Sequence, residues 1–318
     1  MRIAILDLGT NTFNLLIIEA ETGKTGTTIL LSRKEPVRLG EKGINKGKIT
    51  RKAFERGLAA IENHVKYINA HRADQVYAFA TSAIRSAGNG LEFVRVVYDR
   101  FNIGIQVISG NKEAELIYLG VKQAIDMGLK KHLIVDIGGG SNELIIADSE
   151  KIYWKESFPI GMARLLNKFK PSDPIETSQK ESLENHFSEK LCSFFKAAEI
   201  HKPDILIGSS GSFDTFRALL EAMKGGPPAE AYGPYFEFST SEFMVLYQRL
   251  INSTAEERLL MEGMEPMRIE MIVIAAIFVN FIVRKLDIGL LMQSDYALKE
   301  GAVIEILKQP VPYLQQED

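Results

Sequence analysis

Cysteine is almost missing from this sequence, because Cys192 is the single cysteine among 318 residues. One thiol cannot form an intrachain disulfide. A cysteine content this low is typical of proteins in a reducing compartment, and we therefore expect a cytoplasmic protein. Cys192 itself stands in a helical pattern beside apolar residues. That setting predicts a thiol buried in the core.

Long apolar runs and an excess of positive charge are also missing. The most apolar stretch, residues 271–283, is shorter than the roughly 20 residues that a membrane span needs, and charged residues border it, so it predicts a buried core helix. The N-terminal residues show no signal-peptide pattern. The formal net charge of -3 gives no electrostatic case for nucleic acid or an anionic membrane, so we expect neither as a partner.

Several common catalytic motifs do not occur in the sequence. A GxxxxGK[ST] loop and a GxGxxG turn entering a helix are both absent, which argues against P-loop hydrolysis and hydride transfer. The five histidines form no metal-binding spacing such as HExxH, and there is no GxSxG elbow. The glycine-rich turns that do occur lead from one strand into another strand.

The length and the alternating pattern of the chain predict a two-domain α/β protein. At roughly 100–200 residues per domain, 318 residues favour two domains. Apolar residues at helical spacing predict a helix over residues 51–69, and β-rich runs predict strands over 76–80 and 105–108. Ser109 or Asn111 is the expected N-cap of the next helix. Helices that alternate with buried strands imply a mixed or parallel sheet covered on its faces.

The pattern of the first half then repeats. IAILDLGTNTFNLLII and LIVDIGGGSNELIIA align without a gap when Asp7 is placed on Asp136. A second match follows in the same order, between VYAFATSAIRSA, which begins at Val76, and DILIGSSGSFDTF, which begins at Asp204. Two matches in one order predict an internal duplication, with one lobe over residues 1–124 and the other over residues 125–318.

The second half contains further helical patterns and a loop. Residues 177–200 form a long amphipathic stretch, and residues 225–234 form a Gly/Pro-rich loop. A last helix over about residues 296–308, capped by Ser294 or Asp295, is a candidate to pack back on the first lobe.

The two Asp-Gly turns are the strongest candidates for chemistry. A glycine-rich turn can point several backbone N–H groups into one concavity and so bind a phosphate, and hydroxyl and amide side chains add further donors. An Asp at the end of each preceding strand is suited to Mg²⁺. The alternative is two tight hairpins in which Asp is a turn former. The candidate phosphate-binding residues of the turns are Gly9, Thr10, Asn11, Thr12, Gly138, Gly139, Gly140 and Ser141.

Six segments together resemble a known family. They are DLGTNTFNLLI, ATSAIRSA, ISGNKEAELIYLGV, IVDIGGGSNELII, GSSGSFDT and SDYALKEGA, in this order. This set is similar to the exopolyphosphatase/guanosine pentaphosphate phosphohydrolase family of the actin/hsp70/sugar-kinase superfamily, in its short form without a C-terminal helical module. The resemblance implies two duplicated ribonuclease-H-like lobes around a central cleft. It also implies a divalent cation such as Mg²⁺ and hydrolysis of terminal phosphoanhydride bonds in a polyanionic phosphate substrate.

The resemblance also assigns residue roles. Glu113 matches the family glutamate that positions and deprotonates the attacking water, and the start of a helix is expected to keep it ionised. Asp136 and Glu143 match the metal side, with Asp7 as a further candidate. Arg85 matches a phosphate-binding arginine. Ser209 and Gly211, in a loop near the base or ribose in nucleotide-using relatives, are the remaining phosphate-binding candidates.

Some alternatives stay open at this point. Asn142 stands where the family usually has Thr, which puts a hydroxyl role there in doubt. Polyphosphate and guanosine pentaphosphate are not separated by the sequence, and neither is a monomer from a homodimer. An ATP-dependent small-molecule kinase and a non-enzymatic, nucleotide-dependent binding protein of the same superfamily are the two rival functions.

Overall fold

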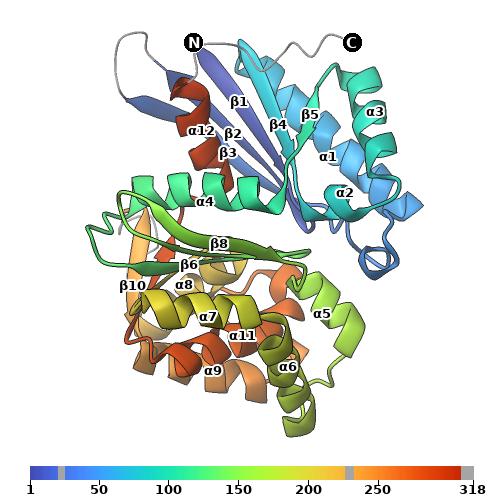
Figure 1. Cartoon of the computed structure of the whole chain (residues 1–318). Helices are drawn as coiled ribbons and strands as arrows, with labels where there is room; N and C mark the ends of the chain where they lie inside the picture. The colour runs from blue at the N-terminus through green and yellow to red at the C-terminus, as the bar shows by residue number, and fades with distance from the viewer. Residues whose placement is uncertain (21–25, 226–232, 309–318) are drawn as a thin grey trace.

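The computed structural model describes residues 1–20, 26–225 and 233–308, and within these ranges the chain forms two α/β lobes (Figure 1). One lobe contains a five-stranded sheet and the other a six-stranded sheet. Helices cover both sheets, and α4 (Gly110–Ala124) runs between the two lobes (Figure 1).

The first lobe is built on a mixed sheet with the strand order β3-β2-β1-β4-β5. Side chains alternate along β1, so that Leu6 faces the core under α1 and α3 while Ile5 faces the core under α4 and the last helix. Both faces are covered, which explains why β1 is apolar at nearly every position. The elements of this lobe are β1 (Arg2–Leu8), β2 (Thr12–Ala20), β3 (Thr27–Pro36), η1 (Ile44–Lys46), α1 (Arg51–Ala70), β4 (Gln75–Ala80), α2 (Ser82–Ser86), α3 (Gly90–Phe101), β5 (Ile105–Val107) and α4.

The second lobe has the strand order β10-β11-β9-β6-β7-β8. Its strands β6 and β7 are buried along their whole length. The strands are β6 (His132–Ile137), β7 (Asn142–Ala147), β8 (Ile152–Phe158), β9 (Ile205–Ser209), β10 (Tyr235–Ser239) and β11 (Leu290–Ser294). The helices are α5 (Met162–Phe169), α6 (Thr177–Lys190), α7 (Cys192–His201), α8 (Gly211–Lys224), α9 (Thr240–Asn252), α10 (Ala255–Leu259), η3 (Pro266–Arg268), α11 (Met271–Leu286) and α12 (Leu298–Lys308).

The two sheets confirm the predicted duplication. In each lobe the first strand pairs antiparallel with the second and parallel with the fourth, β1 with β2 and β4, and β6 with β7 and β9. Asp7 lies opposite Asn14 in the first hairpin, and Asp136 lies opposite Glu143 in the second, as the gapless alignment predicts. This is the ribonuclease-H-like arrangement, to which the second lobe adds β10 at one edge.

The apolar stretch over residues 271–283 is the centre of the second lobe's core, as predicted. Every residue of this stretch is buried in α11, which packs against α5, α6, α8 and α9. None of the helices in the described ranges combines the length and the apolarity that a membrane crossing requires.

Helix α4 contacts elements of both lobes. It packs against β7 and β8 of the second lobe and against α12, which in turn packs against β1 and β2 of the first lobe. The two helices approach closely because glycines face the partner backbone. A Cβ on Gly301 would lie 1.7 Å from the carbonyl oxygen of Leu116, and one on Gly120 would lie 1.9 Å from that of Ala297. Because α4 packs against elements of both lobes, a domain boundary at residue 124 stays a prediction.

The structure corrects the prediction for Cys192, which is exposed. The amphipathic stretch is two helices rather than one, α6 and α7, which meet at Leu191. Leu191 and Phe194 occupy the buried positions at this junction, so Cys192 points outward. Its thiol donates to the carbonyl oxygens of Ser188 and Glu189.

The start of the last helix also differs from the prediction. Helix α12 begins at Leu298, so neither Ser294 nor Asp295 caps it. The N–H of Ala297 instead donates to the Glu300 carboxylate, and the Ser294 hydroxyl donates to the carbonyl of Tyr296. Most of the predicted Gly/Pro-rich loop, residues 226–232, lies outside the described residues.

We expect Gly301→Ala to destabilise the protein although alanine favours helices by about 1 kcal/mol over glycine. The added methyl group has no room against α4, so the free energy of unfolding should fall by roughly 1–3 kcal/mol or more. Gly289→Ala is the matched control, because a Cβ there meets no atom within 4 Å. Thermal unfolding of both variants checks this, and equal melting temperatures would show that the contact is not tight.

Candidate active site

Two equivalent hairpins form the centre of the site. The N–H of Gly9 donates to the carbonyl of Thr12 at 3.0 Å, and the N–H of Gly138 donates to the carbonyl of Ser141 at 3.1 Å. Both turns therefore close in the same way and connect antiparallel strands, β1 to β2 and β6 to β7. The turns of the two lobes meet at the cleft.

The tips of the two hairpins are in close contact, which only glycine permits. A Cβ on Gly139 would lie 2.5 Å from the amide nitrogen of Asn11, and a Cβ on Gly140 would lie 2.6 Å from the hydroxyl oxygens of Thr10 and Ser82. From the sequence, these glycines are expected to bind phosphate. The structure gives them a second role, the direct contact between lobes.

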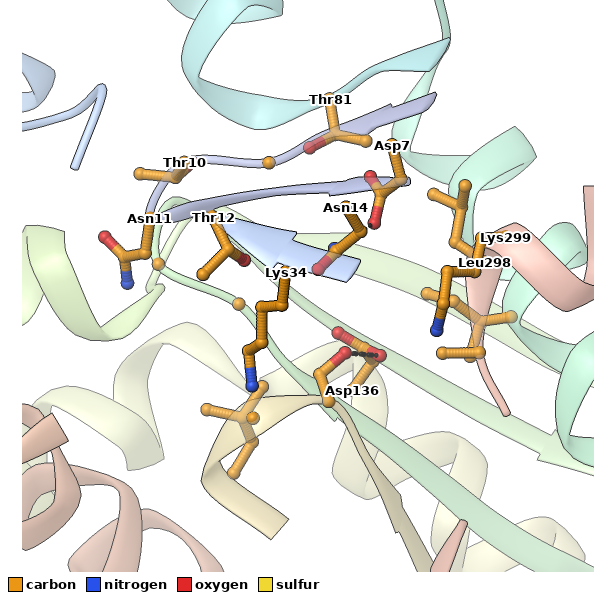
Figure 2. Close-up of a pocket in the computed structure, with 18 of the residues that line it drawn as sticks. Asp7, Thr10, Asn11, Thr12, Asn14, Lys34, Thr81, Asp136, Leu298 and Lys299 are labelled. Carbon is orange, nitrogen blue, oxygen red and sulfur yellow. Dashed lines mark hydrogen bonds between the residues drawn. The ribbon is translucent and has the colours of Figure 1, made fainter. Parts of the chain in front are cut away.

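A cavity of about 280 Å³ opens beside the hairpins. Figure 2 shows Asp7, Thr12 and Asn14 of the first lobe facing Asp136 of the second across it. The predicted site residues that line the cavity are Asp7, Gly9, Thr10, Asn11, Thr12, Glu113, Asp136, Gly138, Gly139, Gly140, Ser141 and Gly211.

Three predicted site residues lie behind the cavity wall. Ser209 is fully buried and its hydroxyl donates to Asp136 at 2.7 Å, so it is not available for the phosphate contact predicted for it. Glu143 is 1% exposed and accepts a hydrogen bond from the Ser157 hydroxyl at 2.6 Å. Arg85 reaches the cavity only through Glu113. Ser209 and Arg85 hold other site residues in place, and none of the three lines the cavity.

Glu113 is the carboxylate held by that arginine. Ser109 caps α4 as predicted, with its hydroxyl accepting from the N–H of Lys112, and this places Glu113 in the first turn. Arg85 Nη1 donates to Glu113 Oε2 at 2.9 Å and to the carbonyl of Ile108 at 2.9 Å. A partly buried ion pair, with a further hydrogen bond to the arginine, fixes the orientation of the carboxylate.

The pKa of Glu113 differs from the expectation. Burial and the neighbouring Glu143 carboxyl raise the pKa of Glu113 well above its ordinary value, although Arg85 opposes the shift. Desolvation therefore outweighs the helix N-terminus that was expected to keep it ionised. A higher pKa makes Glu113 a stronger base than the sequence suggested. Glu115, two residues further along the helix, pairs with Lys155 at 2.7 Å instead.

The other acidic residues of the site share this character. Burial raises the pKa of Asp7 to about 6 against the hydrogen bond from Asn14, and burial with the nearby Asp136 raises the pKa of Glu143 to about 7. Burial also raises the pKa of Asp136, against hydrogen bonds from Ser209 and Ser210. These carboxyl groups lie close enough to disfavour one another's charge.

The chemistry of the lining residues fits a divalent cation. Four cationic side chains line the cavity, Arg33, Lys34, Arg268 and Lys299. Five carboxylic acids also line it, Asp7, Glu113, Asp136, Asp214 and Asp295. Within the described ranges, no three His, Cys, Asp or Glu side chains are grouped so as to hold an ion by themselves. Mg²⁺ does not require such a group, because it takes one or two carboxylates together with waters and substrate phosphates.

Several residues that line the cavity were not predicted from the sequence. Lys34 and Lys299 extend into the cavity on either side of Asp136 in Figure 2. Lys299 lies within SDYALKEGA, so that segment carried a signal for it. Lys34, on β3, carried none, and it bridges the lobes through ion pairs of 3.4 Å with Asp214 and with Glu265.

Two asparagines of the hairpins, Asn14 and Asn142, differ in their relation to the cavity. Asn14 is the counterpart of Glu143 in the gapless alignment, which could have identified it, and its amide donates to Asp7 at 2.8 Å. Asn142 is fully buried and donates to the carbonyl of Ile160 at 3.1 Å. It does not line the cavity, so the Thr-to-Asn departure removes no hydroxyl from the described site.

A family model described as the Ppx/GppA phosphatase family matches residues 16–310. The chain belongs to this family. It is therefore a phosphohydrolase built from two actin-like lobes, as its sequence segments indicated.

The Ppx/GppA relatives match the chain over nearly its full length. Exopolyphosphatase 1 of Mycobacterium leprae is 29% identical over 308 residues, which are 96% of this chain and 90% of that protein. The crystal structure of an exopolyphosphatase from Cytophaga hutchinsonii is 35% identical, has a TM-score of 0.94, and is matched over 97% of this chain and 98% of its own. The Aquifex aeolicus family member, 24% identical with a TM-score of 0.78 over 98% and 99% of the two chains, shares the fold.

The raised pKa of Glu143 predicts a pH-dependent stability of the metal-free protein. The native state keeps a proton that the unfolded chain has released between the ordinary pKa of 4.5 and about 7. The free energy of unfolding should therefore fall as pH rises through this window. We expect the melting temperature to drop from about pH 5 to about pH 8, and Glu143→Gln to reduce the slope. Glu189→Gln, at an exposed residue, is the control and should leave the slope of melting temperature against pH unchanged.

Proposed function

We propose that this protein is an exopolyphosphatase that hydrolyses the terminal phosphoanhydride bond of inorganic polyphosphate and releases orthophosphate. The observation that carries the proposal is the position of Glu113, a buried carboxylate held by Arg85 at the wall of a cavity between two glycine hairpins. The names of the Mycobacterium leprae and Cytophaga hutchinsonii relatives support the substrate. Guanosine pentaphosphate, which also ends in a phosphoanhydride, is the alternative substrate.

The hairpins bind and orient the end of the polyphosphate chain. Backbone N–H groups of the two turns and the hydroxyls of Thr10, Thr12 and Ser141 line the cavity and suit phosphate oxygens. Lys34 and Lys299 bring further positive charge into it. Binding of this kind fixes the terminal phosphorus without any covalent step by the protein.

Glu113 positions the attacking water and accepts its proton. Phosphoryl transfer is in line, so the water lies on the side of the terminal phosphorus opposite the leaving chain. The new bond joins the water oxygen to phosphorus while the bond to the bridging oxygen breaks. Arg85 keeps the carboxylate aimed at the water, and the raised pKa of Glu113 gives it the basicity to take the proton.

Mg²⁺ completes the site in this proposal. Asp136 is the residue that would hold it, with Glu143 and Asp7 as neighbouring carboxyl groups. When bound, the ion supplies neutralisation of phosphoryl oxygen charge. Ser209 and Ser210 hold Asp136 through hydroxyl hydrogen bonds of 2.7 and 2.5 Å. A cytoplasmic setting and a homodimer that extends the groove for long chains stay predictions.

Glu113→Gln should lower turnover by roughly 10²–10⁴-fold or more, because the amide cannot accept the proton. Binding of polyphosphate should persist, since the shape of the side chain is kept. Glu115→Gln is the matched control two residues along the same helix, and it should retain activity because Glu115 pairs with Lys155 instead. Near-normal phosphate release by Glu113→Gln would remove Glu113 from this role.

Substrate choice is decided by measuring orthophosphate release from short polyphosphate, long polyphosphate and guanosine pentaphosphate, with Mg²⁺ and with a chelator. We expect orthophosphate to be released from polyphosphate. This release should require the divalent ion and should not require an acceptor molecule. ADP formation from ATP that depends on an added acceptor would instead support the kinase alternative. Tight ATP binding without release would support the nucleotide-dependent binding protein.

A further inference from the structure

Ser210 has a backbone conformation that glycine adopts much more readily than serine. Its φ is 69° and its ψ is 174°, in a region that is open almost only to residues without a Cβ. Such conformations persist only where the surrounding structure enforces them, and they gather at functional sites. Ser210 lines the cavity beside the hairpins, so the strained backbone lies at the site itself.

The strain arises in a turn that consists of a single residue. Strand β9 ends at Ser209 and α8 begins at Gly211, so the chain changes from strand to helix within Ser210 alone. Ser209 is held in the sheet by its pairing with Asp136 of β6. On the other side, a Cβ on Gly211 would lie 1.8 Å from Arg268 Nη2, which fixes the start of α8. Glycine would make this turn without strain, so the turn itself does not require the side chain of serine.

The Ser210 hydroxyl does not cap the helix that follows. A serine at this position normally accepts a hydrogen bond from a backbone N–H of the first helical turn. Ser109 and Ser239 do so at the starts of α4 and α9, with ordinary φ values of -69° and -75°. Ser210 occupies the same position before α8 but makes no side-chain cap. Its hydroxyl instead donates to Asp136 Oδ2 at 2.5 Å.

Both hydroxyl groups that contact Asp136 donate to the same oxygen. Ser209 and Ser210 donate to Oδ2, at 2.7 and 2.5 Å. Among the residues that the structure describes, none donates a hydrogen bond to Oδ1. Asp136 lines the cavity (Figure 2), so one of its oxygens is held by the protein while the other remains for a ligand. Mg²⁺ demands near-ideal octahedral geometry, which a carboxylate in a fixed orientation favours.

The first lobe lacks these donors at the equivalent positions. Asp7 is the counterpart of Asp136, and the residue paired with it on the neighbouring parallel strand is Phe79, which Ala80 follows. Neither of these side chains can donate a hydrogen bond. The two serines therefore distinguish the second Asp-Gly turn from the first, on the side of the cleft where the proposed function assigns the divalent ion.

We propose that Ser210 is a positioning residue, whose strained backbone aims its hydroxyl at Asp136 Oδ2 so that Oδ1 is presented to a divalent cation. The inference rests on the proposed function, which assigns the cation to Asp136. It explains why serine stands at a position that suits glycine. The hydroxyl raises the affinity for the ion, and the backbone conformation lowers the stability of the fold.

Paired substitutions separate the strain from the hydroxyl. Ser210→Ala and Ser210→Gly both lack the hydroxyl, and only alanine keeps the Cβ. We expect the melting temperature of metal-free Ser210→Gly to exceed that of Ser210→Ala by roughly 3–8 °C, because glycine relieves the strain. The same two substitutions at Ser239, whose backbone is ordinary, should differ by about 2 °C or less. Equal differences at the two positions would overturn the strain.

Binding of the ion tests the role of the hydroxyl. Titration of the metal-free protein with Mn²⁺, followed by the magnetic resonance signal of the free ion, should show roughly tenfold weaker binding in both Ser210 variants than in the wild type. Both Ser239 variants should bind Mn²⁺ as the wild type does, because Ser239 does not line the cavity. Ser210→Gly is expected to be the more stable variant and yet to lose as much affinity as Ser210→Ala, which a merely weakened fold would not produce. Unchanged affinity in either Ser210 variant would overturn the inference.

The outcome is separable from that of the proposed function. A wild-type protein that binds Mn²⁺ more tightly than its Ser210 variants, but releases no orthophosphate from polyphosphate, would retain the inference and contradict the proposed function. A wild-type protein that hydrolyses polyphosphate, with an ion affinity that the Ser210 substitutions leave unchanged, would do the reverse. Absence of Mn²⁺ binding by the wild type would also overturn the inference.

Discussion

The repulsion among buried carboxyl groups is the constraint on which the site depends. Glu113, Asp136 and Glu143 lie close enough that each disfavours the charge of another, and all three are buried. Hydrogen bonds from neighbouring side chains offset this repulsion. Arg85 donates to Glu113, two serine hydroxyls donate to Asp136, and Ser157 donates to Glu143. The result is a site whose carboxyl groups have raised pKa values, because charge that water does not screen interacts strongly.

The sequence reveals those parts of the site that lie within one continuous segment. The hairpins at Asp7 and Asp136 were found by a gapless internal alignment, and the observed strand pairing confirms them. Glu113 was found only through the family resemblance, since a glutamate in a first helical turn has an ordinary explanation. Its raised pKa could not be predicted, because burial and the approach of Glu143 depend on tertiary packing.

Features that depend on distant segments escaped the sequence. Lys34 reaches the cavity from an edge strand, and its carboxylate partners are about 180 and 231 residues away. Cys192 was assigned to the core because its neighbours are apolar, but the break between α6 and α7 turns it outward. Helix α4 carries Glu113 and touches both lobes, so the tight glycine contacts with α12 also fix the position of this carboxyl group.

One of the matched positions at which the duplicated hairpins differ has Asn14 in the first lobe and Glu143 in the second. The first hairpin therefore pairs Asp7 with an amide, whereas the second pairs Asp136 with another carboxyl group. The two sides of the cleft differ in charge although their backbone framework is repeated. A linear polyphosphate has two identical ends and no direction of its own. Under the proposed function, either end can enter such a cleft and meet the same arrangement, so the polarity of the reaction belongs to the protein.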